Sequence, residues 1–296
     1  MGKALYDAFA EARAVFQEVD DALGQKLSAL IFEGPESDLK LTENTQPALM
    51  AVSMAVVRVL DKQGGFRLPE AASFVAGHSL GEYSALCAAG AFSLADTARL
   101  LRLRGQAMQK AVPVGVGAMA ALLGADWDAA QAIAADAAQG EVCAAANDNA
   151  PGQVVISGHA AAVDRAIALA AERGFKRSVK LPVSAPFHCA LMQPAADAMR
   201  AALANATIKP PCVPVVANVT AAAANDPETI RDLLVRQVTG AVRWRESVLY
   251  MKAQGVEQLL ECGSGTVLAG LAKRIDREIT TVSLHTPEDI ERFLSP

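Results

Sequence analysis

Apolar residues recur along much of the chain at the three- and four-residue spacing of amphipathic helices, and short continuous apolar runs separate these stretches. Helices are predicted over Lys3–Leu23, from Asn44–Pro47 to Gly64, and over Ser93–Lys110, Pro194–Ala204, Asp226–Gly240 and Trp244–Gln254, with a further helix ending at Ile275. Buried strands are predicted over Ala71–Ala76, Val213–Val219, Val256–Glu261 and Ile279–Leu284. This alternation is typical of an α/β domain built around a mainly parallel sheet.

The middle of the chain follows a different order of elements. Strand, helix, strand, strand, helix and strand are predicted over Gly117–Leu123, Trp127–Ala138, Val142–Asn147, Gln153–Gly158, Ala160–Arg173 and Lys176–Pro182, with Asn147–Gly152 as the central turn. A β-α-β-β-α-β order is typical of a small ferredoxin-like domain. We therefore expect a ferredoxin-like insert at residues 114–183 within a larger, α/β-hydrolase-like domain formed by residues 1–113 and 184–296.

A Gly-His-Ser-Leu-Gly turn at Gly77–Gly81 stands between a predicted strand and a predicted helix. Strand, G-x-S-x-G and helix is the order of a nucleophile elbow, in which glycines permit a sharp turn that exposes the serine hydroxyl. Ser79 is therefore the candidate nucleophile. The backbone N–H of Leu80 opens the helix and is the candidate donor to a developing oxyanion. A glycine-rich turn without catalytic function is the alternative interpretation.

A serine in such a turn becomes a good nucleophile only when a base accepts its proton. The chain has four histidines. His78 directly precedes the serine, so its side chain is expected to point elsewhere. His188 follows the last predicted strand of the insert, at a domain junction, where clefts form. His188 is the candidate base, and a packed junction histidine is the alternative.

The helix predicted from Ser93 begins with a capping-box-like Ser-Leu-Ala-Asp sequence and carries two arginines near its middle. Arg104 lies beside the apolar stripe of this helix, whereas Arg102 is rotated by about 160° at 3.6 residues per turn. Arg104 is therefore the arginine expected to point inward, where a guanidinium needs an anionic partner. A buried carboxylate of the protein and a substrate carboxylate remain equal alternatives.

Charge and cysteine usage exclude some classes of function. The chain has 27 basic and 32 acidic residues and a net charge of −5, which argues against nucleic acid as a general partner. Five cysteines without a C-x-x-C pair favour reduced thiols in a cytoplasmic protein over disulfides or a zinc site. No apolar run reaches membrane-spanning length, and the N-terminus lacks a signal-peptide pattern. We expect a cytoplasmic monomer without membrane association.

Four longer strings carry a resemblance to a known family. GHSLGEYSAL resembles the active-site serine motif of malonyl-CoA:acyl-carrier-protein transacylases and of the acyltransferase domains of fatty-acid and polyketide synthases. APFHCALMQPAAD resembles the histidine motif of that family, and LRLRGQAMQKAVPVGVGAMAALLG resembles its arginine segment. LLECGSGTVLAGL resembles its C-terminal Gly-x-Gly turn. The resemblance covers nearly the whole chain, including the insert.

The resemblance implies a function and a role for each candidate residue. Ser79 would be acylated, His188 would be the general base and acid, Arg104 would bind the malonyl carboxylate, and the Leu80 amide would be an oxyanion donor. The family orients its histidine with a backbone carbonyl, and the matching position is near Gln237. The implied reaction is ping-pong transfer of malonyl from malonyl-CoA to the phosphopantetheine thiol of acyl carrier protein, in fatty acid biosynthesis, without a metal or redox cofactor.

The sequence departs from the family pattern at its start. Family members usually begin with a strand and a Gly-Gln-Gly-Ser-Gln loop, whose first glutamine provides a second oxyanion donor. This sequence starts with Met1-Gly2-Lys3-Ala4-Leu5, which resembles the segment after that loop. We expect the native reading frame to continue upstream into such a strand and loop, and we expect their restoration to raise stability and transfer rate.

Other functions remain to be distinguished. A serine hydrolase or thioesterase would share the elbow and would usually place an acidic residue between serine and histidine, for which Asp148 and Asp164 are the candidates. A non-catalytic module that binds carrier protein and an acyltransferase of a polyketide or malonate decarboxylase system are further alternatives. Because the chain is acidic overall, an acidic carrier protein would need a local basic patch. Two clusters are candidates: Lys176, Arg177 and Lys180, and Lys273, Arg274 and Arg277.

Overall fold

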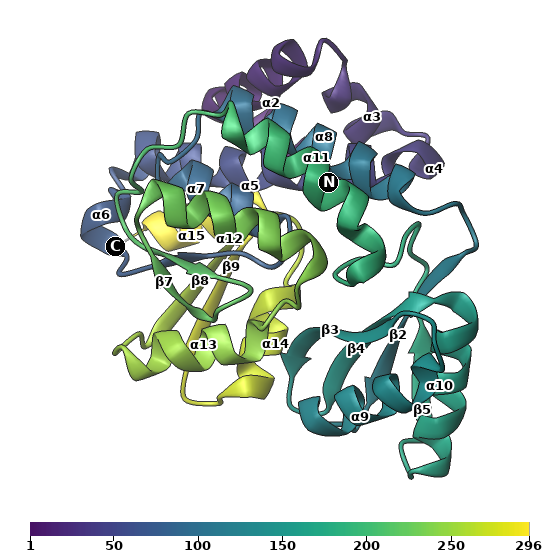
Figure 1. The fold of residues 1–296 in the computed structure, drawn as a ribbon. Coiled ribbons are helices and arrows are strands. Elements are labelled where there is room, and N and C mark those ends of the chain that lie inside the picture. The colour runs from purple at the N-terminus through teal and green to yellow at the C-terminus, as the bar shows by residue number, and fades with distance from the viewer. Residues whose placement is uncertain (296) are drawn as a thin grey trace.

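The computed structural model describes residues 1–295 and is drawn in Figure 1. The N-terminal part consists of α1 (Lys3–Ala8), α2 (Ala10–Leu23), α3 (Leu27–Glu33), α4 (Glu36–Leu39), α5 (Thr42–Gly64), α6 (Leu68–Ala71), β1 (Val75–Ala76), α7 (Gly81–Ala88) and α8 (Leu94–Ala111). The middle part consists of β2 (Gly117–Leu123), α9 (Trp127–Ala138), β3 (Cys143–Ala150), β4 (Gln153–His159), α10 (Ala160–Glu172) and β5 (Arg177–Lys180). The C-terminal part consists of a 3₁₀ turn (Ala190–Met192), α11 (Gln193–Ala204), β6 (Val215–Ala217), β7 (Ala222–Ala224), α12 (Pro227–Thr239), α13 (Trp244–Ala253), β8 (Gln258–Cys262), α14 (Val267–Ile275), β9 (Thr280–Leu284) and α15 (Pro287–Leu294).

The part outside the insert combines helices with strands that pair largely in parallel, so the predicted α/β class is confirmed. The strands there form two small sheets within residues 1–295, whereas one mainly parallel sheet was expected. In the first sheet β1 pairs with β6 in parallel and β7 returns antiparallel to β6, and in the second sheet β8 pairs with β9 in parallel. The two sheets meet through side chains instead of backbone hydrogen bonds, because Phe74, Val216 and Leu259 share one apolar cluster.

The middle part forms a four-stranded antiparallel sheet in the order β3-β4-β2-β5, at the lower right of Figure 1. This order and the two crossover helices confirm the predicted ferredoxin-like topology. Helices α9 and α10 cover one face of the sheet, where Leu122, Ile133 and Val163 are fully buried. The opposite face carries Met119 and Val155, against which the partly buried Phe187 of the C-terminal part packs.

The predicted turn at Asn147–Gly152 is wrong in its first four residues, because β3 continues to Ala150 and only Pro151–Gly152 turn. The physical reason lies in the large domain. The Asp148 N–H donates to the Val242 carbonyl at 2.9 Å, and the Val242 N–H donates to Ala146 at 2.8 Å. Asp148 also pairs with Arg245 at 2.8 Å. Polar residues that look like a turn are therefore held in a strand by contacts from a distant part of the chain.

Two helices differ from their predictions, one by an interruption and one by its starting residue. The helix expected over Lys3–Leu23 is interrupted at Phe9, whose backbone is extended and whose side chain is buried in the core. The Arg13 guanidinium donates to the carbonyl of Tyr6 at 2.9 Å, so the interruption leaves that helix end satisfied. Helix α5 begins at Thr42, which places Pro47 inside the helix and not in its first turn.

Two strands also differ from their predictions. The strand expected over Ala71–Ala76 is limited to Val75–Ala76, because Leu68–Ala71 forms the short helix α6. The alanine-rich segment after Val219, which was expected to be a loop, contains strand β7, which returns along β6 after a turn at Ala221. Alanine-rich runs are compatible with both helix and strand, so the first strand was predicted too long and β7 was missed.

Helices α5 and α8 pack unusually closely. A Cβ atom at Gly105 of α8 would lie 2.5 Å from the Glu43 Cα of α5, so only glycine permits this approach. Ser93 caps α8 as predicted, with the Asp96 N–H donating to its hydroxyl at 3.0 Å. The contact brings Gln46 of α5 next to Arg104 of α8, and both side chains are buried.

Candidate active site

Ser79 lies in a tight turn between β1 and α7. Its φ angle is +53°, in the left-handed region that non-glycine residues rarely adopt. Gly77 makes the turn possible, because a Cβ atom there would lie 1.9 Å from the Gly81 carbonyl oxygen. The Asn218 side chain holds the turn from below, accepting from the Ser79 N–H at 2.8 Å and donating to the Gly77 carbonyl at 2.8 Å. The strand, turn and helix thus follow one another as the sequence predicted.

The Ser79 hydroxyl contacts the His188 ring at hydrogen-bond distance. The Ser79 Oγ and the His188 Nε2 are 2.8 Å apart. The His188 Nδ1 lies 2.9 Å from the Gln237 carbonyl and 3.1 Å from the Gly240 carbonyl. Because carbonyl oxygens only accept, the proton of the neutral ring is assigned to Nδ1, and Nε2 is left to accept from the serine. The structure therefore brings Ser79, His188 and Gln237 together in the arrangement that the resemblance implied.

Burial lowers the pKa of His188 to about 3. The nearby Arg104 guanidinium contributes in the same direction, and the two backbone carbonyls oppose the shift by stabilising the protonated ring. His188 is 4% exposed and has a φ angle of +58°, so the loop after β5 holds the ring in a constrained position. A neutral imidazole is the form that can accept the serine proton.

Arg104 is only 1% exposed, and its guanidinium lies beside the serine. Its Nη1 donates to Gln46 Oε1 at 2.7 Å, and its Nη2 donates to Gln237 Oε1 at 2.9 Å and to Ser79 Oγ at 3.2 Å. None of the ion pairs among residues 1–295 includes Arg104, and its Nε has no hydrogen-bond partner there. The predicted inward orientation is confirmed, and the alternative of a protein carboxylate as direct partner is wrong.

A buried carboxylate, that of Glu82, lies near the Arg104 guanidinium but is separated from it by the Gln237 side chain. Glu82 is 1% exposed and accepts from the Asn218 N–H and from the Gln237 side-chain amide, each at 2.9 Å. Burial raises the pKa of Glu82 to about 7, and its two hydrogen bonds and Arg104 oppose the shift. The Gln237 amide thus stands between Glu82 and Arg104.

Three of these groups were not singled out from the sequence. Gln46 lies in the Thr-Gln-Pro segment that was interpreted only as a helix start, and Glu82 directly follows the elbow pentapeptide. Asn218 directly follows strand β6. A polar residue at the carboxyl end of a strand is a usual signal for a site in α/β proteins, and this signal was present.

His78 points away from the serine, as predicted. Its Nε2 contacts Asn149 Oδ1 of the insert at 2.8 Å, and its ring packs near Trp244 with ring centroids 5.8 Å apart. Burial lowers the pKa of His78. His78 therefore connects the turn that carries Ser79 to strand β3 of the insert.

Leu80 is the residue that precedes α7, and its N–H donates to no acceptor within residues 1–295. This amide is adjacent to Ser79 and sits at the start of a helix, where the dipole favours negative charge. The structure thus leaves one backbone donor available next to the serine.

The acidic residues required by a hydrolase triad lie elsewhere. Asp148 is buried against Arg245, and Asp164 is bonded to Lys180 at 2.8 Å on the surface of the insert. Neither contacts His188, whose Nδ1 is occupied by carbonyl oxygens. The arrangement therefore differs from a serine–histidine–acid triad.

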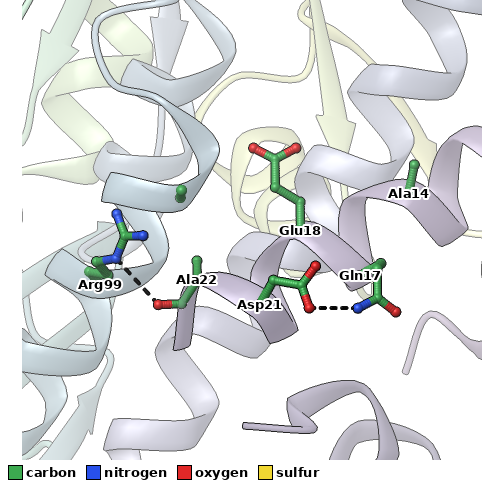
Figure 2. A pocket seen from close by; sticks show the side chains of 7 residues that line it. Ala14, Gln17, Glu18, Asp21, Ala22 and Arg99 are labelled. Carbon is green, nitrogen blue, oxygen red and sulfur yellow. Dashed lines mark hydrogen bonds between the residues drawn. The ribbon is translucent and has the colours of Figure 1, made fainter. Parts of the chain in front are cut away.

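A surface hollow between α2 and α8 contains none of these groups. Figure 2 shows that the Arg99 guanidinium donates to the Ala22 carbonyl at 3.3 Å and that Gln17 donates to Asp21 at 2.7 Å. Most of its polar groups are thus engaged with one another, and Glu18 pairs with Arg58 outside the hollow. Within residues 1–295, all five cysteines are free thiols and no helix combines the length and apolar character needed to cross a bilayer.

Comparison with known proteins relates this geometry to a family. The acyl transferase domain model matches residues 1–276. The malonyl CoA-acyl carrier protein transacylase of Escherichia coli K12 is 50% identical over 272 residues, which are 92% of this chain and 87% of that protein. Both matches include the segments that carry the serine, the arginine and the histidine.

Solved structures show the same similarity. The acyl-carrier-protein S-malonyltransferase of Bartonella henselae is 57% identical with a TM-score of 0.97, covering 99% of this chain and 93% of its own. A malonyl-transacylase in complex with its type II polyketide synthase acyl-carrier protein is 43% identical with a TM-score of 0.96, covering 99% and 94%. With a serine–histidine pair ordered by a backbone carbonyl and an arginine beside it, the chain belongs to the malonyl-CoA:acyl-carrier-protein transacylase family of acyl transferases.

Proposed function

We propose that this acyltransferase moves a malonyl group from malonyl-CoA to the phosphopantetheine thiol of an acyl carrier protein through an ester on Ser79. The observation that carries the proposal is the Arg104 guanidinium, which is buried 3.2 Å from the Ser79 hydroxyl without a carboxylate partner among residues 1–295. The names of the relatives support the same reaction.

The first half-reaction acylates the serine. Ser79 Oγ attacks the thioester carbonyl while its proton passes to His188 Nε2, 2.8 Å away. The Leu80 N–H stabilises the oxyanion of the tetrahedral intermediate. The intermediate collapses, the carbon–sulfur bond breaks, and His188 returns the proton to the CoA thiolate. The product is malonyl-Ser79, and the Gln237 and Gly240 carbonyls stabilise the imidazolium while it exists.

The second half-reaction reverses these roles with a new thiol. The phosphopantetheine thiol gives its proton to His188 Nε2 and attacks the ester carbonyl. The ester bond to Ser79 breaks, and the serine oxygen regains the proton from His188. These steps use the protein side chains and the two thiols, and we assign no step to a metal or redox cofactor.

The charge of the acyl group affects both its binding and the base. A malonyl carboxylate on Arg104 forms a charge-assisted, potentially bidentate pair, whereas an acetyl group leaves the buried cation unpaired. Burial is the main cause of the lowered pKa of His188, and the Arg104 charge adds to it. A bound acyl carboxylate offsets that charge, so the base becomes stronger when the correct acyl group is bound.

Intact-protein mass spectrometry after incubation with a panel of acyl-CoAs tests the proposal most directly. We expect a stable malonyl adduct on Ser79 that disappears when acyl carrier protein is added. Rapid turnover of a simple ester without any thiol acceptor would instead support a hydrolase, and the absence of an adduct would support a non-catalytic carrier-binding module.

The wider setting follows from the same proposal. The carrier protein is that of fatty acid biosynthesis, and a polyketide carrier is the second candidate because one related structure holds such a carrier. We propose that the enzyme acts as a cytoplasmic monomer without membrane association. Loading assays with both kinds of carrier, together with the solution mass of the enzyme, test these points.

The pH dependence of acylation should reflect the lowered pKa of His188. An ordinary histidine base loses activity below about pH 6.5, because the ring is then protonated and cannot accept a proton. With a pKa of about 3, His188 stays in its basic form far below that pH. We expect single-turnover acylation of Ser79 by acetyl-CoA to show no histidine limb between about pH 5 and about pH 7.

Glu82 is a buried group of the site that does titrate near this range, because burial raises its pKa to about 7. The same measurement on Glu82→Gln separates the two groups, because any inflection due to the carboxylate disappears in that variant. An acid limb near pH 6.5 in both proteins would contradict the assigned state of His188.

The two basic clusters lie at opposite edges of the small sheet. Lys176, Arg177 and Lys180 belong to the β5 edge. Lys273 lies in α14, which packs beside β3, and Arg277 follows the end of that helix at Ile275. We call Lys273 and Arg277 the α14 cluster. Three strand spacings of about 4.8 Å separate these edges, so the clusters do not form one continuous patch. Lys180 is already paired with Asp164, while Lys176, Arg177, Lys273 and Arg277 belong to no ion pair within residues 1–295. Lys273 and Arg277 differ in that they line a surface hollow together.

We therefore expect the α14 cluster to bind the acidic carrier protein. Lys273→Glu combined with Arg277→Glu should raise the KM for carrier protein about tenfold, because reversed charges repel an acidic partner. Malonyl loading from malonyl-CoA should keep its rate. Lys176→Glu with Arg177→Glu is the matched control at the other edge, and a KM that changes only in this control would place docking there.

A further inference from the structure

The acceptors around Arg104 have an unusual chemical character. Both terminal nitrogens of the guanidinium donate to glutamine carbonyl oxygens, Nη1 to Gln46 at 2.7 Å and Nη2 to Gln237 at 2.9 Å. The Tyr83 ring lies below, with its centroid 5.8 Å from Arg104 Cζ. Every one of these partners is formally neutral. The guanidinium is thus fixed in position while its full charge remains uncompensated by direct contact.

We propose that Gln46 and the side chain of Gln237 are specificity-determining residues, which hold Arg104 with neutral acceptors and thereby reserve its charge for the carboxylate of the acyl group. This inference rests on the proposed function and adds two residues to it. The established contact of Gln237 with His188 uses its backbone carbonyl, whereas this function uses its side chain.

The orientation of each amide is set by its neighbours. The Arg104 guanidinium only donates, so the Gln46 oxygen faces it, and Gln46 Nε2 donates to the Thr42 hydroxyl at 3.0 Å, one turn earlier in α5. Gln237 Nε2 donates to Glu82 at 2.9 Å and to the Ser79 carbonyl at 3.0 Å. A carboxylate and a carbonyl only accept hydrogen bonds, so the Gln237 amide cannot be reversed without losing both contacts.

Glu82 completes the arrangement from a distance. Its carboxylate is separated from Arg104 by the Gln237 amide, so it attracts the guanidinium without occupying its hydrogen-bond donors. Direct contact would have formed a closed ion pair in a buried site. Breaking such a pair to admit a substrate would leave the protein's own buried carboxylate uncompensated, which is strongly unfavourable. A neutral amide oxygen binds the guanidinium without competing with the acyl carboxylate for its charge.

Gln46→Glu tests the inference, because it keeps the size of the side chain and adds a carboxylate at hydrogen-bond distance from Nη1. The new carboxylate should pair with Arg104 and compete with the acyl carboxylate. We expect the ratio of kcat/KM for malonyl-CoA over acetyl-CoA to fall about 100-fold, mainly through the KM for malonyl-CoA. The thermal midpoint should not fall, since the new pair satisfies both charges.

Two variants separate charge from packing. Gln25→Glu adds the same charge beside the neighbouring arginine, since Gln25 Oε1 accepts from Arg102 Nη1 at 2.5 Å outside the site, and it should leave the ratio unchanged. Gln46→Leu removes the acceptor without adding charge, so it should lower the thermal midpoint but reduce the ratio far less than Gln46→Glu. Should Gln46→Glu fail to fold, Gln237→Glu provides a second route, because it places a carboxylate at the position that accepts from Arg104 Nη2. That variant should also reduce the ratio.

The outcomes are distinguishable. A preference for malonyl that survives in Gln46→Glu would overturn the inference alone, as would an equal loss in Gln46→Leu, because the glutamine would then only fill space. A wild-type protein that shows no malonyl preference would overturn the proposed function, and this inference with it. A selective loss of the malonyl preference in Gln46→Glu, with the preference unchanged in Gln25→Glu, would establish that neutral acceptors reserve the charge of Arg104 for the acyl group.

Discussion

Malonyl loading of the protein is expected to fall by about 10⁴–10⁶ when His188 is replaced by alanine, the range found when a member of a serine–histidine pair is removed. The Ser79 hydroxyl would then lack a base within hydrogen-bond distance, since its other contact is with the Arg104 guanidinium, which only donates. The rate of appearance of the acyl-enzyme, followed by quenched-flow mass spectrometry, measures this effect.

Controls distinguish lost chemistry from lost folding. Ser79→Ala should show no adduct at any time, because the atom that is acylated is absent. His285→Ala removes a histidine that contacts Asp289 of α15 and not the site, and this variant should load at the wild-type rate. If His188→Ala is loaded at a rate close to wild type, another group must take the serine proton. The two carbonyls that orient the His188 ring would then have no role in catalysis.

Arg104→Ala is expected to reduce kcat/KM for malonyl-CoA by about 10²–10³, and to reduce that for acetyl-CoA much less. The two losses differ because malonyl has a carboxylate that pairs with Arg104, whereas acetyl has none. Arg104→Lys keeps a charge but loses the planar fork, so its malonyl rate should lie between those of wild type and Arg104→Ala. Parallel steady-state assays with the two acyl-CoAs give the ratio directly.

Arg102→Ala is the matched control, since Arg102 lies on the same helix and bonds to Gln25 outside the site. It should leave the ratio unchanged. Equal losses for malonyl and acetyl in Arg104→Ala would instead show that the arginine supports the fold, because its hydrogen bonds join α8 to α5 and α12.

Much of this site could be predicted from the sequence because its central signals are local. A serine between two glycines, preceded by a strand and followed by a helix, specifies its own turn, and the position of Arg104 follows from helical periodicity alone. The order of elements in the insert was equally readable. His188 was identified by elimination and by its place at a junction, and its ordering by a carbonyl near Gln237 came from the resemblance.

The remaining groups depend on contacts between distant segments. Nothing near Gln46 in the sequence shows that Gly105 allows α8 to approach α5, and nothing near Glu82 indicates the amide of Gln237 as its neighbour. The extension of β3 through Asn147 and Asp148 was missed for the same reason, since the hydrogen bonds that hold these polar residues come from Val242. Local propensity favours a turn there, and tertiary contacts override it.

The distance in sequence between the site residues has a consequence for how the protein acquires activity. Ser79 and Gln237 are 158 positions apart, and Ser79 and Asn218 are 139 apart, yet both pairs are hydrogen-bonded. Contacts of such separation form late in folding, because the entropy of closing long loops must first be overcome. Partly folded chains could contain the α8 helix and the insert and still be inert toward malonyl-CoA. Formation of the Ser79 adduct during refolding would therefore report the moment at which the last long-range contacts close.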